Sequence, residues 1–190
     1  MEENPRDVAE LASRMRHGQR VKFLFFWGHR PERDGSAGRG CLSQWWPASF
    51  AVDGRTFATA EHYMMWRKAL LFGDEANAER ILQVKHPRQA KELGRGVAGF
   101  DQDRWEACRS EIVLAGSLAK FGQHPDLLRF LLSTGKRVLV EASPLDRVWG
   151  IGLAADDPDA ENPERWRGLN LLGFALTRAR AVLATQIERP

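Results

Sequence analysis

Residues 59–72 read TAEHYMMWRKALLF, and this stretch decides the fold of the chain. Apolar side chains recur on every side of a helix drawn through it, which is typical of a helix buried inside a protein. The same helix carries a carboxylate at Glu61 and an amine at Lys68. Because buried ionisable groups are costly unless they are paired or given a task, the stretch predicts both the centre of the fold and a candidate site.

The two ionisable groups lie on one stripe of this helix, together with Met65 and Phe72, at about 100° per residue. The seven-residue step between them is about 10 Å of rise, too long for the usual helical ion pair. They could instead flank a ligand. Glu61 is either a functional acid or a first-turn acid favoured by the helix dipole. Lys68 either extends to solvent with its stem buried, which local sequence favours, or is desolvated and becomes a usable nucleophile.

Composition describes an ordinary globular protein of one domain, with 190 residues, 43% of them apolar and 28% charged. The net charge of +3 is spread along the chain, so it suits an anionic ligand but lacks the basic stripe of a nucleic-acid binder. Cys41 and Cys108 are far apart, which argues against a disulfide framework and for a cytoplasmic protein. We see no signal core or membrane-spanning segment and expect no membrane partner.

The five histidines show neither HxH nor HxxxH spacing, so we expect no metal site. The glycines around Arg95 match neither the dinucleotide fingerprint nor the P-loop. We therefore expect no cofactor. Arg95 follows a helix stop and is also a candidate to grip a phosphate.

The expected fold is mainly α, with a few short strands. The domain is expected over 21–190, after a weakly packed N-terminal extension at 1–20 that could form a short helix. Hydrophobic periodicity predicts helices at 59–72, 74–85, 87–93, 103–121, 125–133 and 168–185, and strands at 21–27 and 137–142.

Turn and capping residues fix the expected ends of these elements. They are Asp53-Gly54 for a hairpin, Thr59 for an N-cap, Pro87 for a first helical position, Gly94 and Gly135 for helix stops, and Asp103 with Glu106 for a capping box. The inner face of the helix at 103–121 is expected to comprise Trp105, Cys108, Ile112, Ala115 and Ala119.

Two loops add candidate site residues. The segment 28–40 is rich in Gly and Arg, and its arginines are either solvated or close over an anion. Asp146, in SPLDRVWGIG, could pair with Glu61 as the second carboxylate of a glycosidic cleavage, although a turn-forming role is the simpler interpretation. Trp45, Trp46, Trp149 and Trp166 lie in loop-like sequence and could stack on a base.

Together these pieces resemble the NADAR family, also described as YbiA-like N-glycosidases of riboflavin-biosynthesis intermediates. The similarity spans roughly residues 21–183 and rests on EHYM-x-x-x-KA, AK-x-LGR, EASP-x-D-x-x-WGIG and G-x-NLLG in that order. This chain departs from the family at Gln44-Trp45-Trp46 and in the longer loop 28–40, which bear on substrate identity more than on reaction type.

The resemblance implies a compact, mainly helical fold and hydrolysis of an N-glycosidic bond to ribose. Family substrates are phosphorylated ribosylamino-pyrimidines and, in other members, ADP-ribose on guanine bases, including those of nucleic acid. The family's site residues fall on Glu61, Lys68, Trp105 and Asp146. Further motif positions that line or support the pocket are Arg95, Trp149, Gly150, Asn170 and Gly173.

Two mechanisms remain open from the sequence. A carboxylate, Glu61 or Asp146, could activate water directly, or Lys68 could attack the anomeric carbon and pass through a Schiff base; the resemblance favours the lysine. The alternative functions are a non-catalytic module that binds ADP-ribose or NAD and a structural partner domain. The sequence does not specify the physiological substrate, the oligomeric state or any toxin partner.

Overall fold

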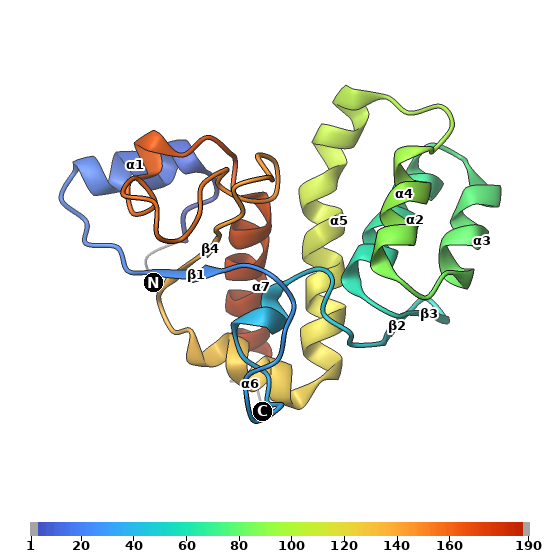
Figure 1. Ribbon diagram of the computed structural model, residues 1–190, viewed down its shortest axis with the longest axis horizontal. Helices are drawn as coiled ribbons and strands as arrows, with labels where there is room; N and C mark the ends of the chain where they lie inside the picture. Colours follow the sequence, from blue (N-terminus) through green and yellow to red (C-terminus); the bar gives the residue numbers. More distant parts are fainter. Residues whose placement is uncertain (1–3, 188–190) are drawn as a thin grey trace. The chain divides into compact units, whose positions relative to one another are not determined.

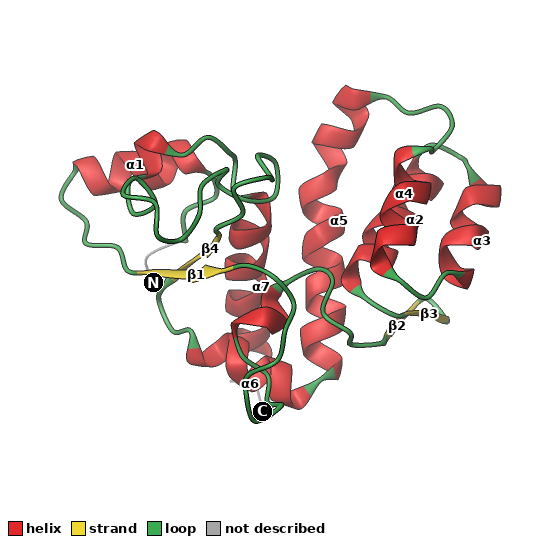
Figure 2. Cartoon of the chain, viewed as in Figure 1, coloured by secondary structure: helices red, strands yellow, loops and turns green. Residues whose placement is uncertain are grey.

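The computed structural model describes residues 4–187, and its chain is mainly helical with two short strand pairs (Figures 1 and 2). The predicted mainly α class is therefore confirmed. The α-helices are α1 (Val8–Arg16), α2 (Ala60–Leu71), α3 (Glu75–Gln83), α4 (Pro87–Arg95), α5 (Gln102–Gln123), α6 (Pro125–Ser133) and α7 (Leu171–Ile187). The strands are β1 (Phe23–Phe26), β2 (Phe50–Val52), β3 (Arg55–Phe57) and β4 (Val138–Glu141), and two 3-10 turns are η1 (Arg39–Leu42) and η2 (Pro163–Arg165). No described helix has the length and apolar character needed to cross a membrane.

The chain divides into two compact units. The central unit is Gln44–Pro125, and the terminal unit combines the described residues of 1–43 with those of 126–190. The boundaries predicted at 1–20 and 21–190 remain a prediction.

Helix α2 is the centre of the central unit, as its composition predicted. It packs against α3, α4 and α5, and eight of its residues are buried. Tyr63 on α2 meets Phe50 and Phe57 of the β2–β3 hairpin, and Trp66 meets Phe57, with ring centroids 5.2 to 6.0 Å apart. This aromatic cluster joins the hairpin to the helix, since ring pairs at such separations attract beyond the area they bury.

Two glycines let neighbouring helices approach α2 closely. A Cβ on Gly94 of α4 would lie 2.0 Å from Sδ of Met65, and one on Gly116 of α5 would lie 2.7 Å from the Tyr63 ring. The prediction that Gly94 ends its helix is therefore wrong, because α4 continues to Arg95 and Gly96 caps it. Gly94 is required by packing rather than by a turn.

The hairpin and the start of α4 follow their local signals. Asp53 and Gly54 both have positive φ, 50° and 73°, as the type I′ turn of a two-residue hairpin requires. Pro87 occupies the first turn of α4, where His86 and Gln89 form a reciprocal cap.

The start and the inner face of α5 were predicted incorrectly. The N-cap is Asp101, which accepts a 2.7 Å hydrogen bond from the backbone N–H of Arg104, so Asp103 and Glu106 do not form the cap. Trp105 and Ile112 are buried as expected. Ala115 is exposed, however, and Cys108 and Ala119 are only half-buried. The buried face instead follows Trp105, Arg109, Ile112, Val113, Gly116, Ser117 and Lys120.

The terminal unit is built around a parallel pair of strands. β1 and β4 pair with Phe23 opposite Val138 and Phe26 opposite Glu141, and α7 packs on β4. The pair is shorter than the predicted strand at 21–27, and Trp27 is 62% exposed. Helix α6 ends at Ser133 as expected, with Gly135 at φ 61° closing the turn that leads into β4.

The N-terminal helix contributes to this core. Leu11 of α1 is fully buried in a cluster with Val138, Val140 and Ile151. The expectation of a weakly packed segment is therefore wrong for residues 8–16. The apolar spacing was visible in the sequence, but the surface that covers it lies more than 120 residues away.

Candidate active site

Lys68 is half-buried in the central unit, and its amine is bound there rather than extended to solvent. Its Nζ donates a 2.8 Å hydrogen bond to the carbonyl oxygen of Gly94, near the end of α4. The amine also lies 4.2 Å from the ring centroid of Phe100 and 5.5 Å from that of Trp105. The interpretation of Lys68 as a side chain that merely reaches the surface does not agree with this geometry.

The rings around Lys68 form a small aromatic wall. Phe72, one turn after Lys68, packs edge-on against Phe100 with centroids 5.3 Å apart, and the Arg104 guanidinium lies over Phe72. Trp105 is 8% exposed, whereas Phe100 is 43% exposed. The amine therefore lies beside one buried ring, that of Trp105, and one ring that is exposed at the surface, that of Phe100.

Burial lowers the pKa of the Lys68 amine from its ordinary value. Desolvation disfavours the charged form of an amine, so a larger fraction of Lys68 is neutral than for a lysine in water. The Gly94 carbonyl and the ring faces act in the opposite sense, since both attract an ammonium group, but the net direction is downward. A neutral amine is the form that can act as a nucleophile.

Glu61 lies in the first turn of α2 and is only 3% exposed. Its backbone N–H donates to the carbonyl of Gln44. Thr59 occupies the N-cap as predicted but makes no capping bond, because its hydroxyl pairs with Nδ1 of His62 at 2.8 Å. Glu61 is thus a buried acid at the positive end of the helix, two turns before Lys68 on the same stripe.

Trp105 and Arg95 lie near Lys68 in different ways. Trp105 contacts the amine directly through its ring. Arg95 is exposed and immediately follows Gly94, whose carbonyl binds the amine. The structure therefore brings Glu61, Lys68, Trp105 and Arg95 into one unit around α2.

Asp146 belongs to the terminal unit and forms the turn that its sequence suggested. Its Oδ1 accepts hydrogen bonds from the backbone N–H groups of Val148 and Trp149, at 2.9 and 2.8 Å. Its carbonyl accepts the N–H of Gly152. One oxygen of the carboxylate thus holds the loop.

Asn170 ties this loop to β4 and α7. It is fully buried at φ 51°, its Oδ1 accepts from the N–H of Glu141, and its Nδ2 donates to the carbonyl of Leu139, both at 3.0 Å. Its own N–H donates to the carbonyl of Gly150. A single side chain therefore fixes the end of β4 beside the 146–152 loop.

The glycines of these motifs are sites of close backbone approach. A Cβ on Gly150 would lie 2.7 Å from the carbonyl oxygen of Glu141, and one on Gly173 would lie 2.1 Å from that of Leu139. Gly150, Asn170 and Gly173 thus support the loop that carries Asp146 and Trp149. That these residues line or support the substrate pocket, as the motif implies, stays a prediction.

Several residues around Lys68 were missed or misread from the sequence. Phe100 gave no signal beyond being an apolar residue in a loop, five positions before Trp105. The Gly94 carbonyl was missed because the sequence predicts a helix stop at Gly94.

Trp46 and Trp166, two of the candidate stacking residues, have structural roles. Trp46 is buried, and Trp166 donates from its ring nitrogen to the Ala160 carbonyl.

Two further expectations concerned anions and metals. Arg30, Arg33 and Arg39 of the 28–40 segment are all exposed, which agrees with the solvated interpretation. Within residues 4–187, no group of three or more His, Cys, Asp or Glu side chains is placed to hold a metal ion.

Comparison with known proteins decides the family. The model of the NADAR domain matches residues 25–184. The chain belongs to the NADAR family. The match covers α2, the Lys68 environment and the Asp146 loop alike.

Relatives of this NADAR protein carry the name N-glycosidase. It is 41% identical over 164 residues to N-glycosidase R617 of Acanthamoeba polyphaga mimivirus, covering 84% of this chain and 95% of that protein. It is 33% identical over 141 residues to N-glycosidase YbiA of Escherichia coli K12, covering 74% and 78% of the two chains. These relatives confirm the predicted reaction class, that of an N-glycosidase.

A solved structure extends the similarity to the fold. The NMR structure of the E. coli protein YbiA matches with a TM-score of 0.69 at 28% identity, over 94% of this chain and 95% of that one. The predicted YbiA-like fold is therefore confirmed.

Proposed function

We propose that this N-glycosidase hydrolyses the bond between the anomeric carbon of a ribose and a nitrogenous base, with Lys68 as the nucleophile. The ribose would carry a phosphate, as ribose 5-phosphate or as ADP-ribose. The observation that carries the proposal is the position of the Lys68 amine, bound to the Gly94 carbonyl between Phe100 and Trp105 with a lowered pKa.

The first step is attack of the neutral amine on the anomeric carbon. The bond from carbon to the base breaks, and its electron pair leaves with the base nitrogen, which takes up a proton. A partly positive sugar forms in this step, and the faces of Phe100 and Trp105 stabilise nearby cationic charge. Glu61, at the other end of the same stripe, is the group we assign to proton transfer and to electrostatic stabilisation.

The second step releases the sugar. The ring oxygen leaves the anomeric carbon and takes a proton, so that the open-chain sugar is joined to Lys68 as a protonated Schiff base. Water adds to that carbon, the carbon–nitrogen bond to Lys68 breaks, and the free amine and the ribose aldehyde are restored. One water is consumed for each bond cleaved.

Asp146 and Arg95 are the remaining residues to which this proposal assigns a role. Asp146 has one oxygen engaged with the loop, and its other oxygen is assigned to guiding the water or the leaving base. Arg95 is exposed beside the Gly94 carbonyl and is assigned to the substrate phosphate, since a guanidinium matches phosphate geometry.

Two substrates test the proposal directly. The purified protein is incubated with a ribosylamino-pyrimidine phosphate and, separately, with DNA carrying ADP-ribosylated guanine, and the free base is measured by mass spectrometry. Release of base from either supports the proposal and identifies the substrate class. Tight binding of ADP-ribose with no release from either substrate would instead favour the non-catalytic binding module. Normal turnover by Glu61→Gln would remove that carboxylate from the scheme.

A further inference from the structure

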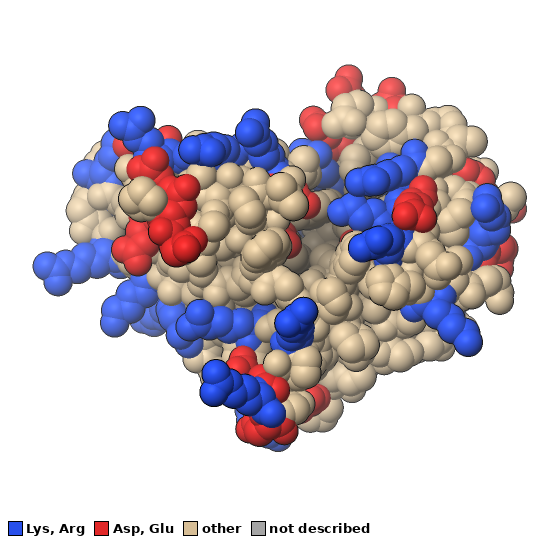
Figure 3. Space-filling model, viewed as in Figure 1, with Lys and Arg blue, Asp and Glu red and all other residues tan. Residues whose placement is uncertain are grey.

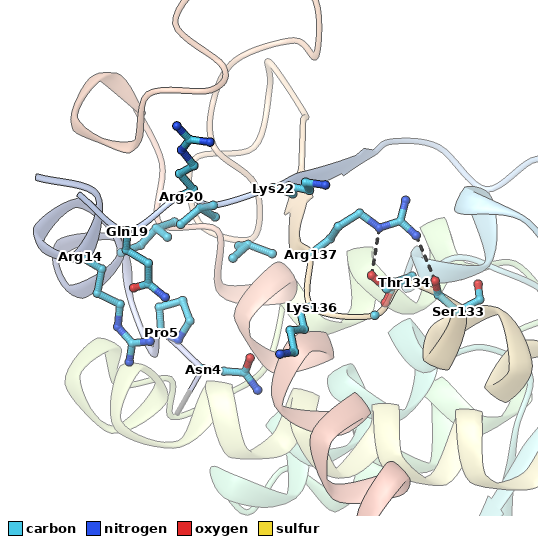
Figure 4. Close-up of a pocket in the computed structure, with 14 residues that line it drawn as sticks. Asn4, Pro5, Arg14, Gln19, Arg20, Lys22, Ser133, Thr134, Lys136 and Arg137 are labelled. Carbon is cyan, nitrogen blue, oxygen red and sulfur yellow. Dashed lines mark hydrogen bonds between the residues drawn. The ribbon is translucent and has the colours of Figure 1, made fainter. Parts of the chain in front are cut away.

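A cavity of about 910 Å³ lies within the terminal unit (Figure 4). Its walls are the segment before α1, helix α1 itself, residues 19–22 leading into β1, and the turn that joins α6 to β4. None of its described lining residues is one of the NADAR motif positions considered above. Its volume is in the range of small-molecule sites in proteins.

The cavity is strongly basic, although the molecule as a whole is not. Basic and acidic side chains are intermixed on the face shown in Figure 3, in keeping with the net charge of +3. Among the described residues that line the cavity there is no carboxylate. The lining cations are Arg14, Arg20, Lys22, Lys136 and Arg137.

Few of these cations are neutralised by acids. Arg14 forms a 2.6 Å ion pair with Glu10. Within residues 4–187, Arg20, Lys22 and Lys136 form no ion pair with a carboxylate, and all three are exposed. In Figure 4, Arg14 and Lys136 end on either side of Asn4. Cations that line one cavity repel one another, and a bound anion relieves that cost.

One wall of the cavity is rigidly held. Arg137 donates from Nε to the Thr134 carbonyl and from a terminal nitrogen to that of Ser133, at 2.9 and 3.0 Å (Figure 4). Behind it, the buried Arg180 donates to the Thr134 hydroxyl and to the Arg137 carbonyl, at 2.6 and 2.9 Å. Burial, and then repulsion from Arg137, lower the pKa of Arg180 to about 10. The turn is therefore preorganised, which reduces the entropy lost when a ligand binds.

We propose that this cavity binds a small anion containing at least two linked phosphate groups. A single phosphate would engage only part of a lining that holds several cations, whereas linked phosphates extend across a cavity of this size. The apolar part of the lining is aliphatic, from Pro5, Leu11, Val21 and Val138. The described lining residues include no aromatic ring for base stacking, on which single-stranded nucleic acids depend.

The test is calorimetric titration of the full chain with tripolyphosphate at physiological ionic strength, beside inorganic phosphate and a short DNA duplex. The pocket variant is Lys22→Glu with Lys136→Glu. The matched control is Arg129→Glu with Arg165→Glu, which makes the same change in charge at exposed positions of the same unit outside the cavity. N-glycosidase activity and the melting temperature are expected to be unchanged in both, since neither variant alters a buried residue or a site residue.

We expect saturable binding of tripolyphosphate that weakens at least about tenfold in the pocket variant and changes little in the control. Equal weakening in both variants would mean diffuse attraction and would overturn the proposal. Inorganic phosphate binding as tightly as tripolyphosphate would overturn the requirement for linked phosphates. Binding of the duplex without binding of tripolyphosphate would identify a nucleic-acid surface instead and would overturn it as well.

Discussion

The amine of Lys68 and the carbonyl of Gly94 are 2.8 Å apart, although 26 residues separate them in the chain. The contact exists because α4 approaches α2 closely enough for Gly94 to lie on Met65. Gly94 therefore has two roles: it leaves room for Met65, and its carbonyl binds the Lys68 amine. The arrangement gives a half-buried lysine with one partially exposed ring, that of Phe100, beside its amine.

The close contact between Gly94 and Met65 predicts that alanine substitution lowers stability at Gly94 but not at nearby Gly96. In Gly94→Ala the new methyl group would meet Met65 at 2.0 Å, so we expect a loss of about 1–3 kcal/mol in unfolding free energy and a fall in kcat as the carbonyl shifts. Gly96→Ala is the control, since its Cβ would have only an ordinary contact at 3.7 Å. Chemical denaturation of both variants measures the difference. Equal stabilities would contradict the packing role.

The lowered pKa of Lys68 predicts the pH dependence of kcat/KM. The neutral amine is the active form, so kcat/KM rises as pH rises through the Lys68 pKa, at a pH below that at which a free lysine titrates. Trp105→Ala admits water to the amine and reduces its desolvation. We therefore expect this substitution to raise the pKa of Lys68 and to move the rise in kcat/KM to higher pH. If kcat/KM instead rises in the acidic range, and Trp105→Ala leaves that rise at the same pH, a carboxylate acting on water would be indicated.

Asp146 offers a way to separate a turn residue from a catalytic one. Asp146→Asn keeps an oxygen that can accept from Val148 and Trp149, so we expect a melting temperature near that of the unmodified protein and a large loss of kcat. Asp146→Ala removes both hydrogen bonds and is expected to cost about 1–3 kcal/mol in addition. Full turnover by Asp146→Asn would leave Asp146 with the structural role alone.

Asn170 is expected to matter for stability through both its backbone and its side chain. Asn170→Gly retains the left-handed φ but loses the bonds to Leu139 and Glu141, for a loss of about 2 kcal/mol in unfolding free energy. Asn170→Ala adds the strain of positive φ, a further cost of about 1 kcal/mol. The midpoints of urea unfolding measure this, and the midpoint of Asn170→Ala is expected to be the lower of the two. An alanine variant as stable as the glycine variant would argue against backbone strain.

Local signals predicted much of the fold, and distant contacts explain where they failed. The Asp53-Gly54 turn and the Pro87 helix start depend only on their neighbours, and both were predicted correctly. The predicted N-cap of α5, Asp103, lies two residues after the observed N-cap, Asp101, because the two residues are equally plausible in local sequence. The burial of Leu11 and the pairing of β1 with β4 depend on residues more than 100 positions away, which no local pattern contains.

The site was predictable to a similar extent. A buried helix with an acid and an amine on one stripe marked Glu61 and Lys68, and the motif added Trp105 beside the amine. Phe100 and the Gly94 carbonyl could not be found, because a loop aromatic and a backbone oxygen acquire meaning only once α4 and α5 pack on α2. Local sequence favoured a solvent-directed Lys68 for the same reason.

Borohydride trapping during turnover tests the role of Lys68 most directly. The protein is mixed with substrate and borohydride, digested, and examined by peptide mass spectrometry, with Lys91→Ala as a lysine control and Lys68→Ala as the site variant. We predict a reduced sugar adduct on Lys68 in the unmodified protein and in the control, and neither adduct nor turnover in Lys68→Ala. Full turnover by Lys68→Ala, with no adduct on Lys68 in the unmodified protein, would contradict the account.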